Sequence, residues 1–224
     1  MAAADCAVIF DVDGVLLDLT RAEEDAFFLP FERRYGLTGL SRDWGSYAIR
    51  NDHNIIEEIL EAHDLATSER DAVLGDYIEV LRGGLLGGLL SPVAIPGARQ
   101  LLDALATEAA LGIATANILA AARLRLEAAG LWNAVAHHPF GADGGGHKRD
   151  IVARAIAATG LPKHRIVYVG DNRNDVEAGR ANGVGFIGFS RDAARRQALA
   201  AAGAPWVSSD HQATLRLIRQ ILAP

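Results

Sequence analysis

The stretch CAVIFDVDGVLL, residues 6–17, decides the fold of this chain. Residues 6–10 are apolar, and their length and their β-branched and aromatic content are typical of a buried strand. The strand ends at Asp11, and a second carboxylate, Asp13, follows two residues later beside Gly14. Open α/β sheets bind ligands beyond the carboxyl ends of their strands, so this placement predicts a functional site directly after the first strand.

The rest of the chain divides into a helical stretch and a stretch in which strands and helices alternate. Residues 20–90 carry apolar side chains at helical spacing, and Ser91-Pro92 ends this pattern. The alternation predicts an α/β fold, a Rossmann-like parallel sheet with helices on both faces. We expect residues 1–17 and 93–224 to form this core and residues 18–92 to form an inserted α-helical cap. The later strands are expected at 111–115, 134–136, 165–169, 184–189 and 205–207.

Composition excludes several classes of protein. The chain has 224 residues, of which 50% are hydrophobic and 22% charged, and its net charge is −6. That charge gives no general attraction for nucleic acid or for an anionic membrane surface. The one cysteine, Cys6, cannot form an intramolecular disulfide, and no apolar run reaches the ~20 residues that span a bilayer. The start of the chain lacks the basic region of a signal peptide. We therefore expect a cytoplasmic protein, a monomer or homodimer, that binds neither nucleic acid nor membrane.

Polar residues follow the expected strands, where a parallel sheet brings them together. They comprise four carboxylates, one hydroxyl and one ammonium: Asp11, Asp13, Asp171, Asp175, Thr115 and Lys148. Two unit charges ~4 Å apart repel by about 4 kcal/mol at an effective dielectric constant near 20, so such a cluster either binds a divalent cation or becomes protonated. Oxygen ligands favour a hard divalent ion, Mg²⁺ before Ca²⁺. The ion, the lysine and nearby backbone N–H groups together suit one phosphoryl group.

These motifs, in this order, resemble those of the haloacid dehalogenase-like (HAD) superfamily. The sequence Asp11-Val-Asp-Gly-Val-Leu16 is similar to its DxDGx(L/V) signature, and Gly170–Asp175 is similar to its GDxxxD motif. Thr115 and Lys148 stand where that family has a Ser or Thr and a Lys. Residues 178–183 resemble the phosphoglycolate-phosphatase-like members, which carry a small α-helical cap. The resemblance covers residues 5–20 and 93–210.

The resemblance implies a role for each of these residues. Asp11 is the nucleophile, which forms an aspartyl-phosphate, and Asp13 is the general acid and base. The phosphoryl group is bound by Asp11, Thr115, the backbone of Ala116, and Lys148. Mg²⁺ is held by Asp11, the backbone carbonyl of Asp13, and Asp171, while Asp175 holds Lys148 or a metal-bound water. The family commonly has Pro after the Lys, where this chain has Arg149, so Arg149 and Lys163 are alternatives to Lys148.

The function expected on this basis is a Mg²⁺-dependent phosphatase that acts on a small phosphorylated metabolite, a phosphomonoester. Dehalogenase members lack an acid two residues after the nucleophile, so Asp13 favours work on phosphoesters. The alternatives are a phosphomutase of the same family, similar to beta-phosphoglucomutase, and a non-catalytic binding member of the fold. Substrate specificity is expected in the cap, where Arg50 and Asn51 are the candidate substrate contacts.

Overall fold

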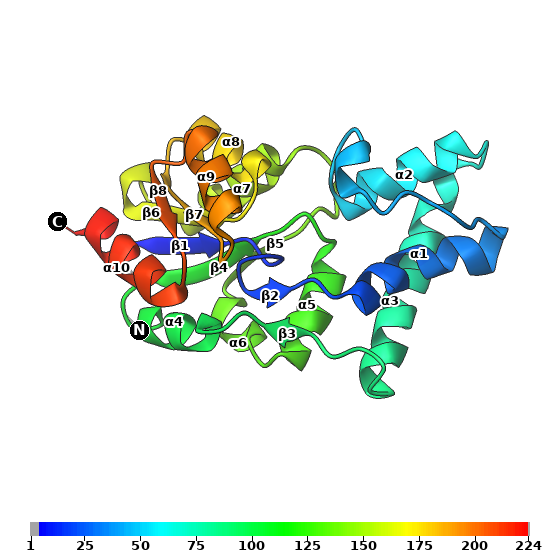
Figure 1. Cartoon of the computed structure of the whole chain (residues 1–224), viewed down its shortest axis with the longest axis horizontal. Coiled ribbons are helices and arrows are strands. Elements are labelled where there is room, and N and C mark those ends of the chain that lie inside the picture. Colours follow the sequence, from blue (N-terminus) through cyan, green and yellow to red (C-terminus); the bar gives the residue numbers. More distant parts are fainter. Residues whose placement is uncertain (1–4, 224) are drawn as a thin grey trace.

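A six-stranded parallel sheet forms the core, in a computed structural model that describes residues 5–223 (Figure 1). Every neighbouring pair of strands runs parallel, which confirms the expected fold class. The central position of β1 places the end of the DxD stretch between two other strand ends. In sheet order the strands are β5 (His138–Phe140), β4 (Ala110–Ala114), β1 (Ala7–Phe10), β6 (Ile166–Gly170), β7 (Gly185–Phe189) and β8 (Trp206–Ser208).

Helices cover both faces of this sheet because side chains of a strand alternate between its faces. Val8 and Phe10 of β1 pack into one hydrophobic cluster, whereas Ala7 and Ile9 pack into another. The first cluster includes side chains of α4 (Ala98–Leu105) and α6 (Trp132–Val135), two helices that lie below the sheet in the view of Figure 1. The C-terminal helix α10 (His211–Leu222) packs on the same cluster. The helices on the upper side are α7 (Lys148–Thr159), α8 (Arg173–Asn182) and α9 (Ala193–Ala201).

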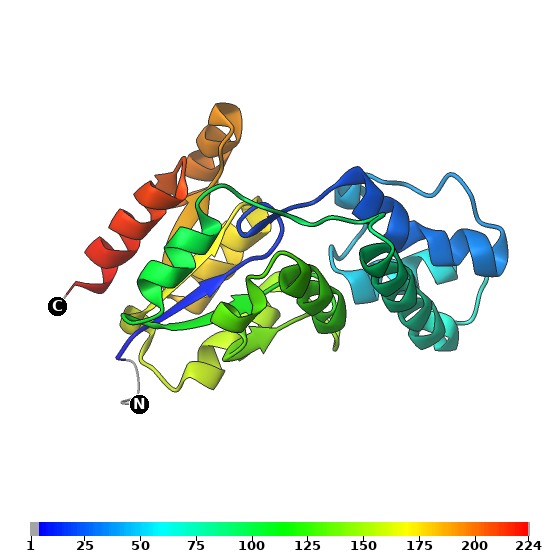
Figure 2. The same cartoon turned by 90° about the horizontal axis from the view of Figure 1, so that it is seen from below.

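The helical segment after β1 lies beyond one end of the sheet, as Figures 1 and 2 show. The chain enters and leaves it through a two-stranded antiparallel ladder, in which Leu17 pairs with Ala94 and Asp18 with Val93. The segment has its own hydrophobic cluster, centred on buried residues such as Phe31 and Leu60. Its elements are β2 (Leu17–Asp18), α1 (Arg21–Tyr35), η1 (Trp44–Ser46), α2 (Asp52–Ala62), η2 (Thr67–Glu69), α3 (Arg70–Leu86) and β3 (Val93–Ala94).

Helix α5 (Leu119–Ala128) packs against both parts of the molecule. Its Ala122 and Leu126 belong to the cluster below the sheet, whereas Ala121 belongs to the cluster of the helical segment. A side chain on this buried face of α5 can therefore contact the core and the helical segment at once. Arg125 occupies such a position and is fully buried.

The expectation of a strand at 134–136 is wrong. Residues 132–135 form the short helix α6, and the strand β5 begins three residues after its end, at His138. Leu131 and Val135 are both fully buried and stand four residues apart, which is the spacing of one helix face and not the alternation of a strand. The three residues of β5 form an edge strand that includes Pro139, so hydrophobic patterning gives little sign of it.

Two further points complete the fold. A short helical turn, η3 (Lys163–Arg165), precedes β6. Within residues 5–223, no helix combines the length and the apolar character needed to cross a membrane.

Candidate active site

The turn after β1 presents Asp11 at the carboxyl end of the sheet. The backbone N–H of Asp11 donates to the carbonyl of Val169 on β6 (2.9 Å), so the turn starts in register with the neighbouring strand. The N–H of Val12 donates to Asp11 Oδ1 (2.8 Å) and helps to orient the carboxylate. Gly14 follows with φ 77°, and a Cβ there would lie 2.2 Å from Asp171 Oδ2. Only glycine allows this turn to approach Asp171 so closely.

Three carboxylates meet where β1 and β6 end. Asp11, Asp171 and Asp175 are buried, and one ligand atom of each lies within 4.8 Å of the others. Lys148 Nζ lies 2.8 Å from Asp11 Oδ1 and 3.2 Å from Asp175 Oδ1. Arg195 Nη1 lies 3.4 Å from Asp171 Oδ2. Three carboxylates thus lie beside two cationic side chains, which leaves one negative charge that a bound cation can balance.

The carboxylate of Asp175 is hydrogen-bonded to other groups of the protein. Its carboxylate accepts hydrogen bonds from Tyr168 Oη (2.5 Å) and from the backbone N–H groups of Asp171 (3.2 Å) and Asn172 (3.0 Å). It also lies at the start of α8, where it forms a capping box with Asn172. With Lys148 Nζ 3.2 Å from Oδ1, both oxygens of Asp175 have partners within the chain.

Burial governs the ionisation of the cluster. It raises the pKa of Asp11 well above the usual range, against the opposing charge of Lys148. It also raises the pKa of Asp171 to about 7, with a further contribution from the charge of Asp175. Burial lowers the pKa of Lys148, but the carboxylates of Asp11 and Asp175 outweigh it, and the net shift is upward. The charged forms of Asp11 and Asp171 thus call for a cation, and their oxygen donors fit a hard divalent ion such as Mg²⁺.

Thr115 and Ala116 lie beside this cluster at the end of β4. Thr115 is buried, and its backbone N–H donates to the carbonyl of Phe140 (3.0 Å). Its hydroxyl donates to Asn117 Oδ1 (3.3 Å), so the side chain is held in place. Strand β4 is the direct neighbour of β1, which explains why Thr115 and Asp11 reach one site.

Nearly all the site residues expected from the sequence line one pocket of about 380 Å³. Asp175 is fully buried and does not line this pocket, although Lys148, to which it is paired, does. Arg149 and Lys163, the alternatives to Lys148, are exposed and do not line it. The expected residues that line the pocket are Asp11, Asp13, Arg50, Asn51, Thr115, Ala116, Lys148 and Asp171.

The two candidate substrate contacts in the helical segment differ in character. Arg50 is exposed at the pocket wall. Asn51 is buried and caps α2, because its Oδ1 accepts from the N–H of Asn54 (2.9 Å). Its Nδ2 donates to the carbonyl of Gly146 (2.7 Å) in the glycine-rich loop of the core. The amide of Asn51 therefore joins the helical segment to the core, whereas Arg50 is exposed and lines the pocket.

The sequence analysis missed several residues of the pocket, and Arg125 is the most important of them. It lines the pocket from α5 and forms an ion pair with Asp13. Its place on a helix face with Ala121, Ala122 and Leu126 is the sign that was available, since a charged residue on an apolar face needs partners. Other lining residues that were not predicted as site residues include Glu23, Tyr77 and Arg195.

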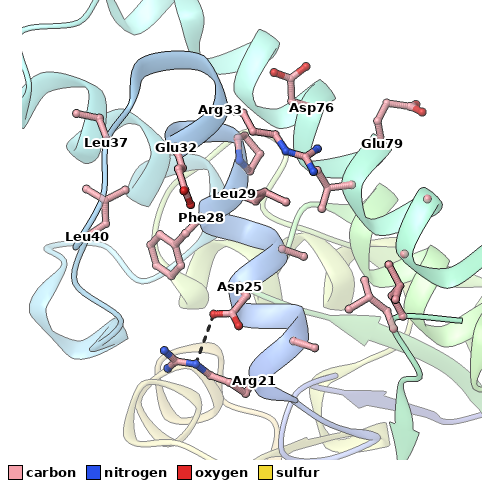
Figure 3. Close-up of a pocket in the computed structure, with 18 of the residues that line it drawn as sticks. Arg21, Asp25, Phe28, Leu29, Glu32, Arg33, Leu37, Leu40, Asp76 and Glu79 are labelled. Carbon is pink, nitrogen blue, oxygen red and sulfur yellow. Dashed lines mark ion pairs between the residues drawn. The ribbon is translucent and has the colours of Figure 1, made fainter. Parts of the chain in front are cut away.

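A larger hollow of about 990 Å³ lies elsewhere, between α1 and α3 (Figure 3). The figure shows an ion pair at its rim between Arg21 and Asp25, whose atoms lie 3.4 Å apart. Arginines and carboxylates both line this hollow, and Phe28 and Leu29 supply an apolar part. The carboxylate cluster is not part of this wall, so the smaller pocket is the candidate active site.

Comparison with known proteins identifies the family. A family model for haloacid dehalogenase-like hydrolases matches residues 7–183, which is most of the chain. The chain therefore belongs to the haloacid dehalogenase-like hydrolases, and it is an enzyme of that superfamily. No curated protein matches the sequence.

Solved structures share the fold over nearly the whole chain at low sequence identity. A protein of Clostridium acetobutylicum predicted to be a phosphatase is 17% identical, with a TM-score of 0.71, and the match covers 97% of this chain and 99% of that one. A protein of Haemophilus somnus 129pt predicted to be a phosphoglycolate phosphatase is 16% identical, with a TM-score of 0.70 and coverage of 97% and 99%. A protein of Bacteroides vulgatus assigned as a beta-phosphoglucomutase is 18% identical, with a TM-score of 0.72 and coverage of 99% and 92%.

Proposed function

We propose that this protein is a Mg²⁺-dependent phosphatase that hydrolyses a small phosphorylated metabolite through an aspartyl-phosphate on Asp11. The observation that carries the proposal is the position of Asp11. Its carboxylate lies at a strand end, 2.8 Å from the ammonium of Lys148 and beside Asp171, in a pocket that also holds Asp13. A carboxylate beside an ammonium and a bound metal ion is suited to attack a phosphoryl group, whose own charge would otherwise repel it.

The binding of the phosphoryl group falls to the chain's own donors and to the metal. Lys148, the hydroxyl of Thr115 and the N–H of Ala116 supply hydrogen bonds to the phosphoryl oxygens. Asp11, the carbonyl of Asp13, and Asp171 would hold Mg²⁺. When bound, this ion neutralises charge on the phosphoryl oxygens and on the two carboxylates.

The reaction proceeds in two transfers. In the first, an oxygen of Asp11 attacks phosphorus, the bond from phosphorus to the leaving oxygen breaks, and Asp13 donates its proton to that oxygen. In the second, water attacks the aspartyl-phosphate, its proton passes to Asp13, and the bond from phosphorus to Asp11 breaks. Inorganic phosphate is released, and both aspartates return to their starting states.

Residues 18–92 act as the cap in this proposal. Arg50 is its candidate contact to the organic part of the substrate, because its guanidinium stands exposed at the pocket wall. The loop with Asn51 holds the cap against the core. A closed cap excludes water during the first transfer, which protects the phosphoryl group from reaction with solvent.

The test is phosphate release from a panel of phosphorylated metabolites and an aryl phosphate, with and without Mg²⁺. We expect release to require Mg²⁺ and to disappear in the Asp11→Asn variant. Asp103→Asn, an exposed aspartate on α4, is the matched control and should behave as the wild type. Release by the Asp11→Asn variant at the wild-type rate would overturn the proposal. A protein that isomerises a sugar phosphate when primed with its bisphosphate, with little release, would be a phosphomutase instead.

A further inference from the structure

The guanidinium of Arg125 joins Asp13 to the cap. Arg125 Nη2 lies 2.6 Å from Asp13 Oδ1, and Nη1 lies 3.2 Å from Asp13 Oδ2. On its other edge, Nε lies 2.6 Å from Glu23 Oε1. The side chains of Arg125 and Glu23 are each 1% exposed, whereas that of Asp13 is 27% exposed toward the pocket. The one cation therefore lies between a buried cap carboxylate and the carboxylate that faces the substrate.

The two contacts to Asp13 restrict its rotation. A guanidinium is planar, and its paired N–H groups match the two oxygens of a carboxylate in a single orientation. Within residues 5–223, no other side chain is hydrogen-bonded to Asp13. The orientation of this carboxylate thus depends on Arg125.

Glu23 restricts Arg125 in turn. Its Oε2 accepts from the N–H of Thr20 (2.9 Å) and from the Thr20 hydroxyl (2.6 Å), in the capping box that starts α1. Its Oε1 remains for Arg125. Asn117 adds a further acceptor, whose Oδ1 lies 3.2 Å from Arg125 Nη1. The guanidinium is therefore held from the cap and from the core, and its position is set before it meets Asp13.

We propose that Arg125 is a positioning residue that holds Asp13 in the orientation needed for proton transfer, and that Glu23 of the cap fixes Arg125 for this task. The proposal rests on the proposed function, because it assigns to Asp13 the proton transfers described there. Proton transfer needs the carboxyl group within hydrogen-bond reach of the leaving oxygen, and an unheld side chain meets that condition in only part of its rotamers. Oδ1 accepts the shorter contact from Arg125 (2.6 Å), whereas the contact to Oδ2 is longer (3.2 Å), so Oδ2 is the oxygen that exchanges its proton with the leaving group and the attacking water.

The test compares two substrates that differ in their need for a proton. An alkyl phosphate leaves as an alkoxide unless an acid protonates it, whereas 4-nitrophenyl phosphate has a stable leaving group. In the charge-balanced double variant Arg125→Gln/Glu23→Gln, kcat/KM for the alkyl phosphate should fall about 100-fold, and in Arg125→Lys it should fall less. For the aryl phosphate it should fall less than about 5-fold, because kcat/KM reports the first transfer, in which that substrate needs no acid.

Two further measurements separate positioning from other roles. The inhibition constant of the corresponding alkyl phosphonate should stay within about 3-fold of the wild type, since Arg125 does not bind the substrate in this proposal. Arg125→Lys should retain more activity toward the alkyl phosphate than the double variant, because an ammonium can still reach one oxygen of Asp13. Arg123→Gln is the matched control, because Arg123 is exposed on the same helix and pairs with Glu127. It should match the wild type on both substrates.

Three outcomes would overturn the proposal. An equal fall for both substrates would make Arg125 a structural residue only. A rise in the inhibition constant that matches the loss in kcat/KM would make it a substrate-binding residue. A wild type that releases no phosphate dependent on Asp11 would overturn the proposed function and this proposal together, whereas the first two outcomes leave the proposed function intact.

Discussion

Lys148 Nζ bridges Asp11 and Asp175, at 2.8 Å from an oxygen of the first and 3.2 Å from an oxygen of the second. The lysine begins α7, whereas the two carboxylates follow β1 and β6, so one ammonium links three elements of the core. Lys148 is itself buried, as are its partners. Lys148 thus stabilises the two carboxylates at the strand ends and is also part of the proposed phosphoryl site.

Replacement of Lys148 by methionine should weaken both stability and activity. A buried carboxylate that loses its partner costs about 3–5 kcal/mol, so the free energy of unfolding should fall by roughly this amount in metal-free buffer. Phosphate release should fall at least about 100-fold, as it does when one donor to a developing charge is removed. Urea unfolding and phosphate-release assays measure the two effects.

Lys163→Met is the control for that change, because Lys163 is exposed. Millimolar Mg²⁺ should restore part of the stability of Lys148→Met, since a cation bound by Asp11 and Asp171 replaces the missing charge. A variant as stable as the wild type without Mg²⁺ would show that the cluster does not depend on the lysine.

The residues at the carboxyl ends of the strands could be predicted from two features of the sequence, the apolar run before each residue and the alternation that predicts a parallel sheet. Asp11, Thr115 and Asp171 each follow a short apolar run, and a parallel sheet brings the ends of adjacent strands together. The sequence alone did not decide between Lys148 and Arg149. The structure distinguishes them, because Arg149 is exposed to solvent. The resemblance to the HAD superfamily supplied the order of the motifs, and the family comparison confirms it.

The contacts between cap and core could not be predicted in the same way. Arg125 meets Glu23 over a separation of 102 residues, and neither belongs to a motif. The strand β5 was also missed, because a three-residue edge strand carries too few side chains for a pattern. Sequence periodicity reports on one element that is long enough to show a pattern. It gives no sign of a contact between two elements or of a strand of three residues.

Asp52 connects the cap to the core by hydrogen bonds, and its burial disfavours the charged form of its carboxyl group. Its Oδ2 accepts from the N–H of Ile118 (2.9 Å), and its own N–H donates to the carbonyl of Ala116 (3.0 Å). Burial raises its pKa to about 7. A raised pKa means that this group favours folding at low pH, and that its contribution is lost as the pH rises from about 4 through about 7.

The variant Asp52→Asn should therefore gain stability at high pH. The amide oxygen still accepts from Ile118, and no buried charge forms, so the free energy of unfolding at pH 8 should rise by about 1–3 kcal/mol over the wild type. Near pH 4 the two proteins should differ little. Asp52→Ala should instead be less stable at both values, because the buried N–H of Ile118 loses its acceptor. Denaturant unfolding at the two pH values decides, and equal stability of the Asp52→Asn variant and the wild type at pH 8 would contradict the expectation.

His211 should set part of the acid stability. It is buried at the start of α10, stacks on Phe189 with ring centroids 4.4 Å apart, and its Nε2 lies 2.9 Å from the carbonyl of Val15. Burial lowers its pKa to about 4. The unfolded chain binds a proton near pH 6.5 and the folded chain does not, so stability is complete above pH 6.5 and falls as the pH drops to about 4.

The size of this loss is about 3 kcal/mol, which follows from 1.36 kcal/mol for each unit of pKa difference. In His211→Gln the amide can still donate to Val15 and no proton is taken up, so the loss between pH 6.5 and 4 should be smaller by that amount. His164→Gln, at an exposed position in η3, should keep the wild-type slope. Denaturant unfolding between pH 4 and 7 measures the slopes. If His211→Gln kept the wild-type slope, the buried imidazole would have no part in acid unfolding.

A comparison of Gly14 with Gly36 distinguishes the backbone strain of a side chain at positive φ from the steric clash of its Cβ. Both have φ near 70°, at 77° and 68°, which an alanine adopts only with strain of about 1–2 kcal/mol. At Gly36 a Cβ would meet no atom within 4 Å, so Gly36→Ala should lose only that strain energy and keep its activity. At Gly14 the Cβ would lie 2.2 Å from Asp171 Oδ2, well inside contact distance.

The turn or the carboxylate must therefore move in Gly14→Ala. Because Asp171 is a proposed Mg²⁺ ligand, the displacement should weaken Mg²⁺ binding as well as stability, and it should do so at least about 10-fold if the ligand is lost from the ion. Calorimetric titration with Mg²⁺ and thermal unfolding, carried out on both alanine variants, measure the two effects. Equal Mg²⁺ affinity in the two variants would mean that Asp171 does not bind the ion, and the metal site would then have to be built on other oxygens.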